Sequence, residues 1–166
     1  MSDSTDFWDW VVTAYGRPGV AELCLDLQDA HGQNVPLLLW AIWAGQGGRR
    51  VEAAQAVATA RAWQQVIVPL REVRRRLKTT VTEDDDAQRL PVREQVKAVE
   101  LAAEKALMTL LESQSSPPTL DVAALSVLPG ARNAVVLNGI LAVATAWSPD
   151  TPLERLAQLS ARLLEG

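Results

Sequence analysis

The residues of this chain that could do chemistry are concentrated near its N-terminus. Its only cysteine and its only histidine, Cys24 and His31, lie there beside the carboxylates of Glu22, Asp26 and Asp29. On a helix advancing about 100° per residue, those three carboxylates share a stripe about 60° wide. Such a stripe could hold a divalent cation or a basic partner. We favour the solvated face of an amphipathic helix, and we predict no metal site.

His31 and Cys24 have structural interpretations that compete with catalytic ones. His31 precedes Gly32 at the predicted C-terminus of this helix, where the helix dipole favours a protonated imidazole. We favour a capping role over that of a proton carrier working with Asp26 or Asp29. Cys24 falls on the apolar side of the helix, as a buried hydrophobic residue would. No nucleophile motif or glycine-rich phosphate loop is present, so we predict no catalytic residue and no cofactor.

A second polar stripe lies in the basic segment 49–78, which carries eight bases against Glu52 and Glu72. Like charges three or four residues apart on a helix repel each other, so this stripe requires anionic neighbours. The acidic helix stripe, the acidic segment that follows, or an external phosphate could supply them. An internal ion-pair network is the favoured interpretation. The stripe shares an arc of about 100° and consists of Arg71, Arg74, Arg75 and Lys78.

Six of the eight aromatic residues lie between positions 7 and 43. Trp40 and Trp43 are one helical turn apart, whereas Trp8 and Trp10 cannot face the same direction. Core packing is the default role of such residues. A pocket walled by these four tryptophans is the alternative, with polar side chains at its mouth. The candidates for the mouth are Arg17, Gln28 and His31.

The apolar periodicity is helical almost throughout, and no segment alternates with a period of two. We therefore predict an all-α single domain over residues 1–166, a bundle of about six to eight helices around an apolar helix at 132–147. Asp6, Pro18 and Asn34 mark three early helix starts, and Pro69 predicts a break or kink in segment 49–78. The other predicted elements are an acidic loop at 79–90, a helix from Pro91 to about 112, a Ser/Pro linker at 113–119, a short helix at about 120–127 and an amphipathic helix after residue 150.

The overall composition narrows the classes of function. The chain has 166 residues, a net charge of -4 and a sequence pI near 5.0, which disfavours nucleic acid as a partner. Its longest apolar run is shorter than the ~20 residues a membrane span needs, so we predict no membrane insertion. A single cysteine fits a reducing compartment, and the acidic start differs from a signal peptide. We expect a cytoplasmic protein.

The combined pattern resembles a proteobacterial family of short hypothetical proteins, catalogued as domain of unknown function 2390. The resemblance covers about the first half to two-thirds of the chain. That family has no established activity, so the resemblance implies no catalytic residue. The segments that carry it are Phe7-Trp8-x-Trp10, Tyr15-x-Arg17-Pro18-Gly19-Val20, Cys24-Leu25-x-Leu27-Gln28-Asp29-x-His31-Gly32, Val35, Leu37-Leu38-Leu39-Trp40, Trp43 and, more loosely, Trp63, Val68-Pro69-Leu70-Arg71 and Arg74-Arg75-x-Leu77-Lys78.

Three functions remain open on the sequence. The favoured hypothesis is a non-enzymatic binding or regulatory module that uses the Trp-rich N-terminal region and the arginine stripe. Its partner would be another protein or a small anionic ligand. The first alternative is a metal-dependent helical enzyme in which Asp26 and Asp29 act on a phosphate or diphosphate held by Arg71, Arg74 and Arg75. The second alternative is nucleic-acid binding through segment 49–78.

Overall fold

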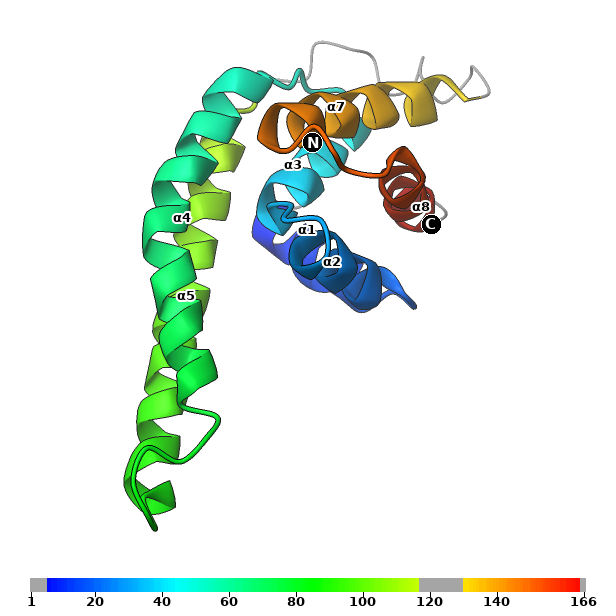
Figure 1. Ribbon diagram of the computed structural model, residues 1–166. Helices are drawn as coiled ribbons and strands as arrows, with labels where there is room; N and C mark the ends of the chain where they lie inside the picture. The colour runs from blue at the N-terminus through cyan, green and yellow to red at the C-terminus, as the bar shows by residue number, and fades with distance from the viewer. Residues whose placement is uncertain (1–5, 117–129, 165–166) are drawn as a thin grey trace.

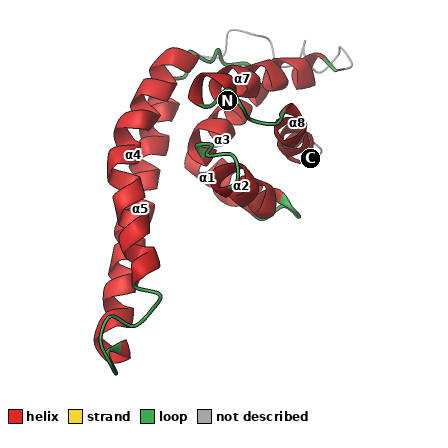
Figure 2. Ribbon diagram, in the orientation of Figure 1, coloured by secondary structure: helices red, strands yellow, loops and turns green. Residues whose placement is uncertain are grey.

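A computed structural model describes residues 6–116 and 130–164 of the chain. Within these ranges the chain forms seven α-helices and no strand, packed as a single domain (Figures 1 and 2). The predicted all-α class is therefore confirmed. The predicted short helix at about 120–127 lies outside the described residues.

The most enclosed element is α3 (Val35–Gln46), in which ten of twelve residues are buried. It begins where predicted, because the Asn34 side chain accepts a hydrogen bond of 2.9 Å from the Leu37 amide. Helices α1, α2, α4, α5 and α7 all contact it. The neighbouring α7 (Ala131–Trp147) is also strongly apolar, but it buries one face only. The helix that others surround is thus α3 rather than the segment 132–147.

Two short helices pack beside α3 and form the N-terminal part of the fold. Helix α1 (Phe7–Tyr15) starts at Asp6, whose carboxylate accepts a hydrogen bond of 2.9 Å from the Trp8 amide. Helix α2 (Val20–Asp29) starts just beyond Pro18, with Gly19 at the N-cap in a left-handed conformation. The chain leaves α2 through Gly32, whose φ of 62° is also left-handed, as predicted.

Helices α4 (Ala53–Arg76) and α5 (Asp86–Gln114) form a long antiparallel hairpin that extends well beyond the rest of the molecule (Figure 1). Of the break or kink predicted at Pro69, the break is wrong, because α4 continues through this residue. The helix predicted from Pro91 also starts earlier, at Asp86. Arg89 holds this first turn, since it donates to Asp85 Oδ1 at 2.9 Å and to the Leu77 carbonyl at 2.6 Å. Only the first part of the predicted loop 79–90 is non-helical.

The C-terminal helix α8 (Leu153–Leu164) closes the domain against α2 and α7. The linker predicted at 113–119 starts two residues late, because Ser113 and Gln114 still belong to α5, and residues 117–119 are outside the described ranges. None of the helices in the described part of the chain has the length and apolar character needed to cross a bilayer.

Candidate functional site

Two pockets of similar size open on the side of the α4–α5 hairpin that faces the other helices. The polar pocket has a volume of about 410 Å³ and the apolar pocket about 430 Å³, both within the roughly 300–1,000 Å³ range of small-molecule sites. Gln28 lines both. A small cavity between them shares Arg71 with the polar pocket and Glu104 with the apolar pocket. The two pockets therefore adjoin at the N-terminal end of α3.

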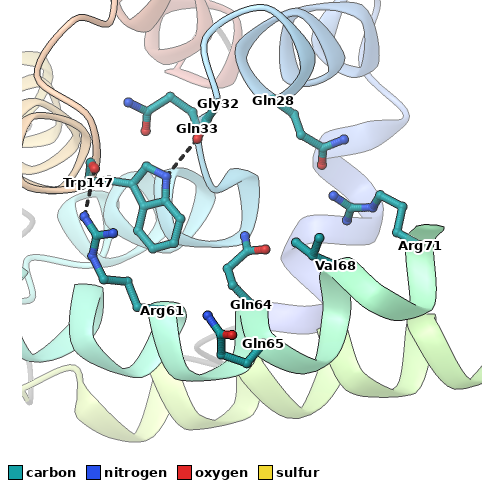
Figure 3. Close-up of a pocket in the computed structure, with 9 residues that line it drawn as sticks. All are labelled: Gln28, Gly32, Gln33, Arg61, Gln64, Gln65, Val68, Arg71 and Trp147. Carbon is teal, nitrogen blue, oxygen red and sulfur yellow. Dashed lines mark hydrogen bonds between the residues drawn. The ribbon is translucent and has the colours of Figure 1, made fainter.

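One wall of the polar pocket is a single face of α4. Residues at positions i, i+3, i+4, i+7 and i+10 of a helix point in similar directions, and the pocket residues of α4 have this spacing. In Figure 3 the side chains of these α4 residues point toward the end of α2. Trp147 and Arg61 lie at one end of the pocket, and Gln28 and Arg71 lie at the other. The wall consists of Arg61, Gln64, Gln65, Val68 and Arg71, and the opposite side of Gln28, Gly32, Gln33 and Trp147.

Arg61 and Trp147 hold each other at one end of the polar pocket. Arg61 donates a hydrogen bond of 3.0 Å to the Trp147 carbonyl, and its guanidinium carbon lies 4.8 Å from the centre of the indole ring. The indole N–H donates to the Gly32 carbonyl at 2.8 Å, which fixes the ring (Figure 3). No carboxylate among the described residues lies within 4.0 Å of the Arg61 guanidinium. This end of the pocket therefore carries a positive charge that pairs with no carboxylate of residues 6–116 and 130–164.

Gln33 contributes a buried amide to the same pocket. Only 2% of Gln33 is exposed, and its side-chain nitrogen donates to the Ala144 carbonyl at 3.2 Å and to the Thr151 hydroxyl. Its Oε1 atom accepts no hydrogen bond from the described part of the chain. A buried carbonyl oxygen without a donor is costly. This oxygen is enclosed by the protein, and the amide nitrogen of the same side chain links the segment after α2 to the end of α7.

The arginine stripe forms an internal ion-pair network, but the main partners of Arg71 and Arg74 are not those considered from the sequence. Arg71 contacts Glu100 at 3.0 Å and Glu104 at 2.7 Å, both on α5, and Arg74 also pairs with Glu100. Burial alone would raise the pKa of Glu100, but the hydrogen bonds from Arg74 and Arg71 outweigh it and hold that pKa below its ordinary value. The described residues thus already neutralise the centre of the stripe.

The contact between the acidic stripe of α2 and the arginines is limited to one exposed pair. Arg75 lies 3.5 Å from Asp29, and both side chains are more than half exposed. Asp26 turns to the other side, where it pairs with Arg155 of α8 at 3.2 Å and lies 3.9 Å from His31. Neither aspartate lines the polar or the apolar pocket. Within the described ranges, no three His, Cys, Asp or Glu side chains come together as metal ligands would.

The apolar pocket lies between α1, α3 and α5. Its walls are mostly hydrophobic, and its polar groups are Gln28, Glu104 and the Tyr15 side chain. Burial raises the pKa of Glu104 despite its pairing with Arg71. The Trp8 ring at the edge of the pocket carries the Lys105 ammonium 4.9 Å from its centre. The hydrophobic lining is Trp8, Val11, Val12, Val35, Pro36, Leu101 and Met108.

Tyr15 links the apolar pocket to the single cysteine. Although 41% of Tyr15 is exposed, its hydroxyl reaches inward and shares a hydrogen bond with the Cys24 thiol. Burial raises the pKa of Tyr15 well above its usual range, and the neighbouring thiol adds to the shift. Burial also raises the pKa of Cys24 to about 11. The thiol is therefore a protonated, buried group, as its place on the apolar side of α2 predicts.

Several predicted site residues have structural roles away from the pockets. Trp40 is 0% exposed and Trp43 is 7% exposed, so both belong to the core. Trp10 is partly buried and donates to Gln46 Oε1 at 3.1 Å. Arg17 donates to the Leu163 carbonyl at 2.9 Å, at the end of α8, and so does not stand at the mouth of a tryptophan-walled pocket.

Trp8, Gln28 and Arg71 are the predicted site residues that do line a pocket. Sequence reasoning missed Arg61, Gln64, Gln65 and Trp147. The helical spacing of Arg61, Gln64 and Gln65 on α4 can be read from the sequence, but a polar face of that kind usually faces solvent. What makes it a pocket wall is Trp147, which comes from the far end of the chain.

Comparison with known proteins adds a family and no activity. No curated protein and no solved structure matches the chain. A family model described as protein of unknown function matches residues 6–111, which hold all of the apolar pocket and every residue of the polar pocket except Trp147. The chain therefore belongs to the family catalogued as domain of unknown function 2390.

Proposed function

We propose that this protein is a non-enzymatic binding module that holds a small anionic molecule in its polar pocket. The observation that carries the proposal is the state of Arg61. Its guanidinium lies at the pocket wall with no carboxylate of the described residues within 4.0 Å. A carboxylate or phosphate oxygen is the natural partner of such a group.

The other pocket residues fit a small polar ligand. The side-chain amides of Gln28, Gln64 and Gln65 offer donors and acceptors along the groove. The Trp147 ring adds an apolar surface beside the cation. A few polar groups around an apolar surface are typical of small-molecule sites.

The two alternative functions have less support. A diphosphate-processing enzyme requires Arg71 and Arg74 to meet phosphate groups, and a nucleic-acid binder using segment 49–78 would draw on the same two arginines among its bases. These two arginines instead contact Glu100, which is 6% exposed, and Arg71 also contacts Glu104. A ligand would have to displace paired, partly buried carboxylates, and this is unfavourable. A ligand that binds Arg61 would not have to displace a described carboxylate.

Binding can be measured through the intrinsic tryptophan fluorescence, to which Trp147 contributes, and through thermal unfolding. The probes are inorganic phosphate, phosphomonoesters and small mono- and dicarboxylates. We expect at least one probe to raise Tm and change the fluorescence in a saturable manner, because a ligand that binds only the folded state stabilises it. Arg61→Gln should abolish both effects.

Arg155→Gln is the matched control, because Arg155 is an exposed arginine outside both pockets. It should leave binding unchanged. Trp147→Phe separates the two readouts, since it should reduce the fluorescence change while part of the thermal shift persists. Binding that is equally strong in the Arg61→Gln variant, or absent across all the probes, would contradict the proposed function.

A further inference from the structure

The α4–α5 hairpin carries apolar side chains on the side that faces away from the rest of the molecule. We call this surface the outer face. In Figure 1 the hairpin forms one edge of the molecule, with the other described helices on its opposite side. Five large hydrophobic residues of this face are 40–54% exposed: Val66, Val73, Val92, Val99 and Leu110.

The apolar residues of the outer face follow a heptad pattern on both helices. Spacings that alternate between three and four residues are typical of helices that pack in coiled-coil fashion within a bundle. On α4 the exposed positions are Val66 and Val73, flanked by Trp63 and Leu70, which also pack against the core, with Leu77 just beyond the helix end. On α5 the exposed positions are Val92, Val99 and Leu110, flanked by Val96, Ala106 and the buried Ala103.

Contacts along the hairpin bring the two stripes together. Gln114 donates to Thr59 at 2.8 Å near one end, and Arg71 meets Glu104 at 2.7 Å further along. In this antiparallel register, Val73 lies level with Val99. Each stripe lies about 180° around its helix from the pocket-lining residues of that helix. The outer face and the two pockets therefore point in opposite directions.

The outer face also lacks charge. At about 100° per residue, all charged side chains of α4 fall within an arc of about 200°, and those of α5 within about 160°. The remaining arcs merge into one uncharged surface, although charged residues make up 22% of the chain. Beside the heptad positions this surface holds further uncharged residues, and they include Gln55, Thr59, Ala62, Pro69, Gln95, Ala102, Thr109 and Ser113.

We propose that the outer face binds the same face of a second copy of this chain, so that the two hairpins form a four-helix bundle. A two-fold axis brings a face against itself, and any net charge would then meet like charge. An uncharged heptad face avoids this repulsion. A helical hairpin separated from a four-helix bundle would expose the same kind of surface, because the other half of its apolar core would be missing.

The size of the surface suits a stable dimer. A helix of 24 residues is about 36 Å long, and two helices side by side span about 18 Å. The face thus measures roughly 650 Å² per copy, or about 1,300 Å² in total, within the range of specific interfaces. Both pockets stay open in this dimer, so its failure would leave the proposed ligand site intact.

The test is the molar mass of the full chain in solution, measured by sedimentation velocity and by light scattering coupled to gel filtration. We expect a dimer at about 100 µM, since interfaces of this size bind in the micromolar range or tighter. Val73→Glu and Val99→Glu each place a charge from both copies in the apolar interface. Each should convert the dimer to a monomer while the helical circular dichroism signal is retained.

Leu25→Glu is the matched control, because Leu25 is 57% exposed on α2, away from the hairpin. The protein that carries Leu25→Glu should remain a dimer. A wild-type chain that stays monomeric at about 100 µM would overturn the proposal and leave the face to a different protein. A dimer that survives both hairpin substitutions would overturn it as well, because the contact would then lie elsewhere.

Discussion

Arg71 of α4 reaches across the hairpin to Glu104 of α5, with 2.7 Å between Nη2 and Oε1, at the point where the polar and apolar pockets meet. The same guanidinium also contacts Glu100 at 3.0 Å. One arginine thus joins two carboxylates whose pKa values are shifted in opposite directions. The centre of the candidate site is therefore also a structural junction.

The two carboxylates should affect stability in opposite ways as the pH changes. The folded-state pKa of Glu100 lies below its ordinary value of 4.5, so its contribution is present above that pH and is lost as the pH falls through the folded-state pKa. Glu100→Gln should cost about 2 kcal/mol at neutral pH. Urea unfolding of both proteins across the acidic range should show this difference shrinking toward lower pH.

Glu104→Gln is the internal comparison. Burial raises the pKa of Glu104, so its contribution is present at low pH and is lost as the pH rises through the folded-state value. Relative to the wild type, this variant should become more stable with rising pH. If the two variants show parallel pH profiles, the opposite shifts of these carboxylates are wrong.

Two glycines at the α3–α7 interface should respond differently to alanine. A Cβ atom at Gly45 would lie 3.0 Å from Val136 Cα and Cγ2, whereas one at Gly139 would meet its nearest neighbours at 3.6 Å. Gly45→Ala should therefore destabilise the fold by about 1–3 kcal/mol through overpacking. Gly139→Ala should stabilise it by about 0.5–1 kcal/mol, because alanine loses less backbone entropy in a helix. Thermal unfolding of both variants would decide, and equal effects would show that α3 and α7 do not approach closely at Gly45.

Arg17 should anchor the end of α8. Its guanidinium donates to the Leu163 carbonyl at 2.9 Å, and the helix dipole also stabilises a positive charge at this C-terminus. Arg17→Ala should cost about 1–2 kcal/mol, and hydrogen exchange should speed up in α8. Arg155→Ala, which removes the exposed pair with Asp26, should stay within about 0.5 kcal/mol of the wild type. An unchanged exchange rate of α8 in the first variant would argue against the anchoring role.

Cys24 should be unreactive in the folded protein. Burial raises the pKa of its thiol to about 11, so roughly one thiol in a thousand would be ionised at pH 8. A thiol-reactive dye at that pH should label the native chain far more slowly than the urea-unfolded chain. Tyr15→Phe removes a hydrogen-bond partner that lowers this pKa and should slow native labelling further. Rapid labelling of the native protein would show that the thiol is accessible.

The sequence determined the helices, because helix formation depends on signals that lie close together in the chain. Asp6 and Asn34 accept the hydrogen bonds that their cap positions predict, and Gly32 has the left-handed conformation expected after α2. Local signals were weaker at two prolines. Pro69 and Pro91 both lie inside helices, since a long hairpin tolerates the loss of one backbone hydrogen bond at each.

The tertiary structure decided which groups meet. The sequence showed that Arg71 and Arg74 needed anions, but Glu100 became their partner only because α5 folds back along α4. Periodicity placed Arg61 on a polar face, and that face became a pocket wall only where Trp147 packs against it. A single sequence specifies which side of a helix is polar. The long-range packing of the chain determines whether that side meets solvent, a carboxylate or a pocket.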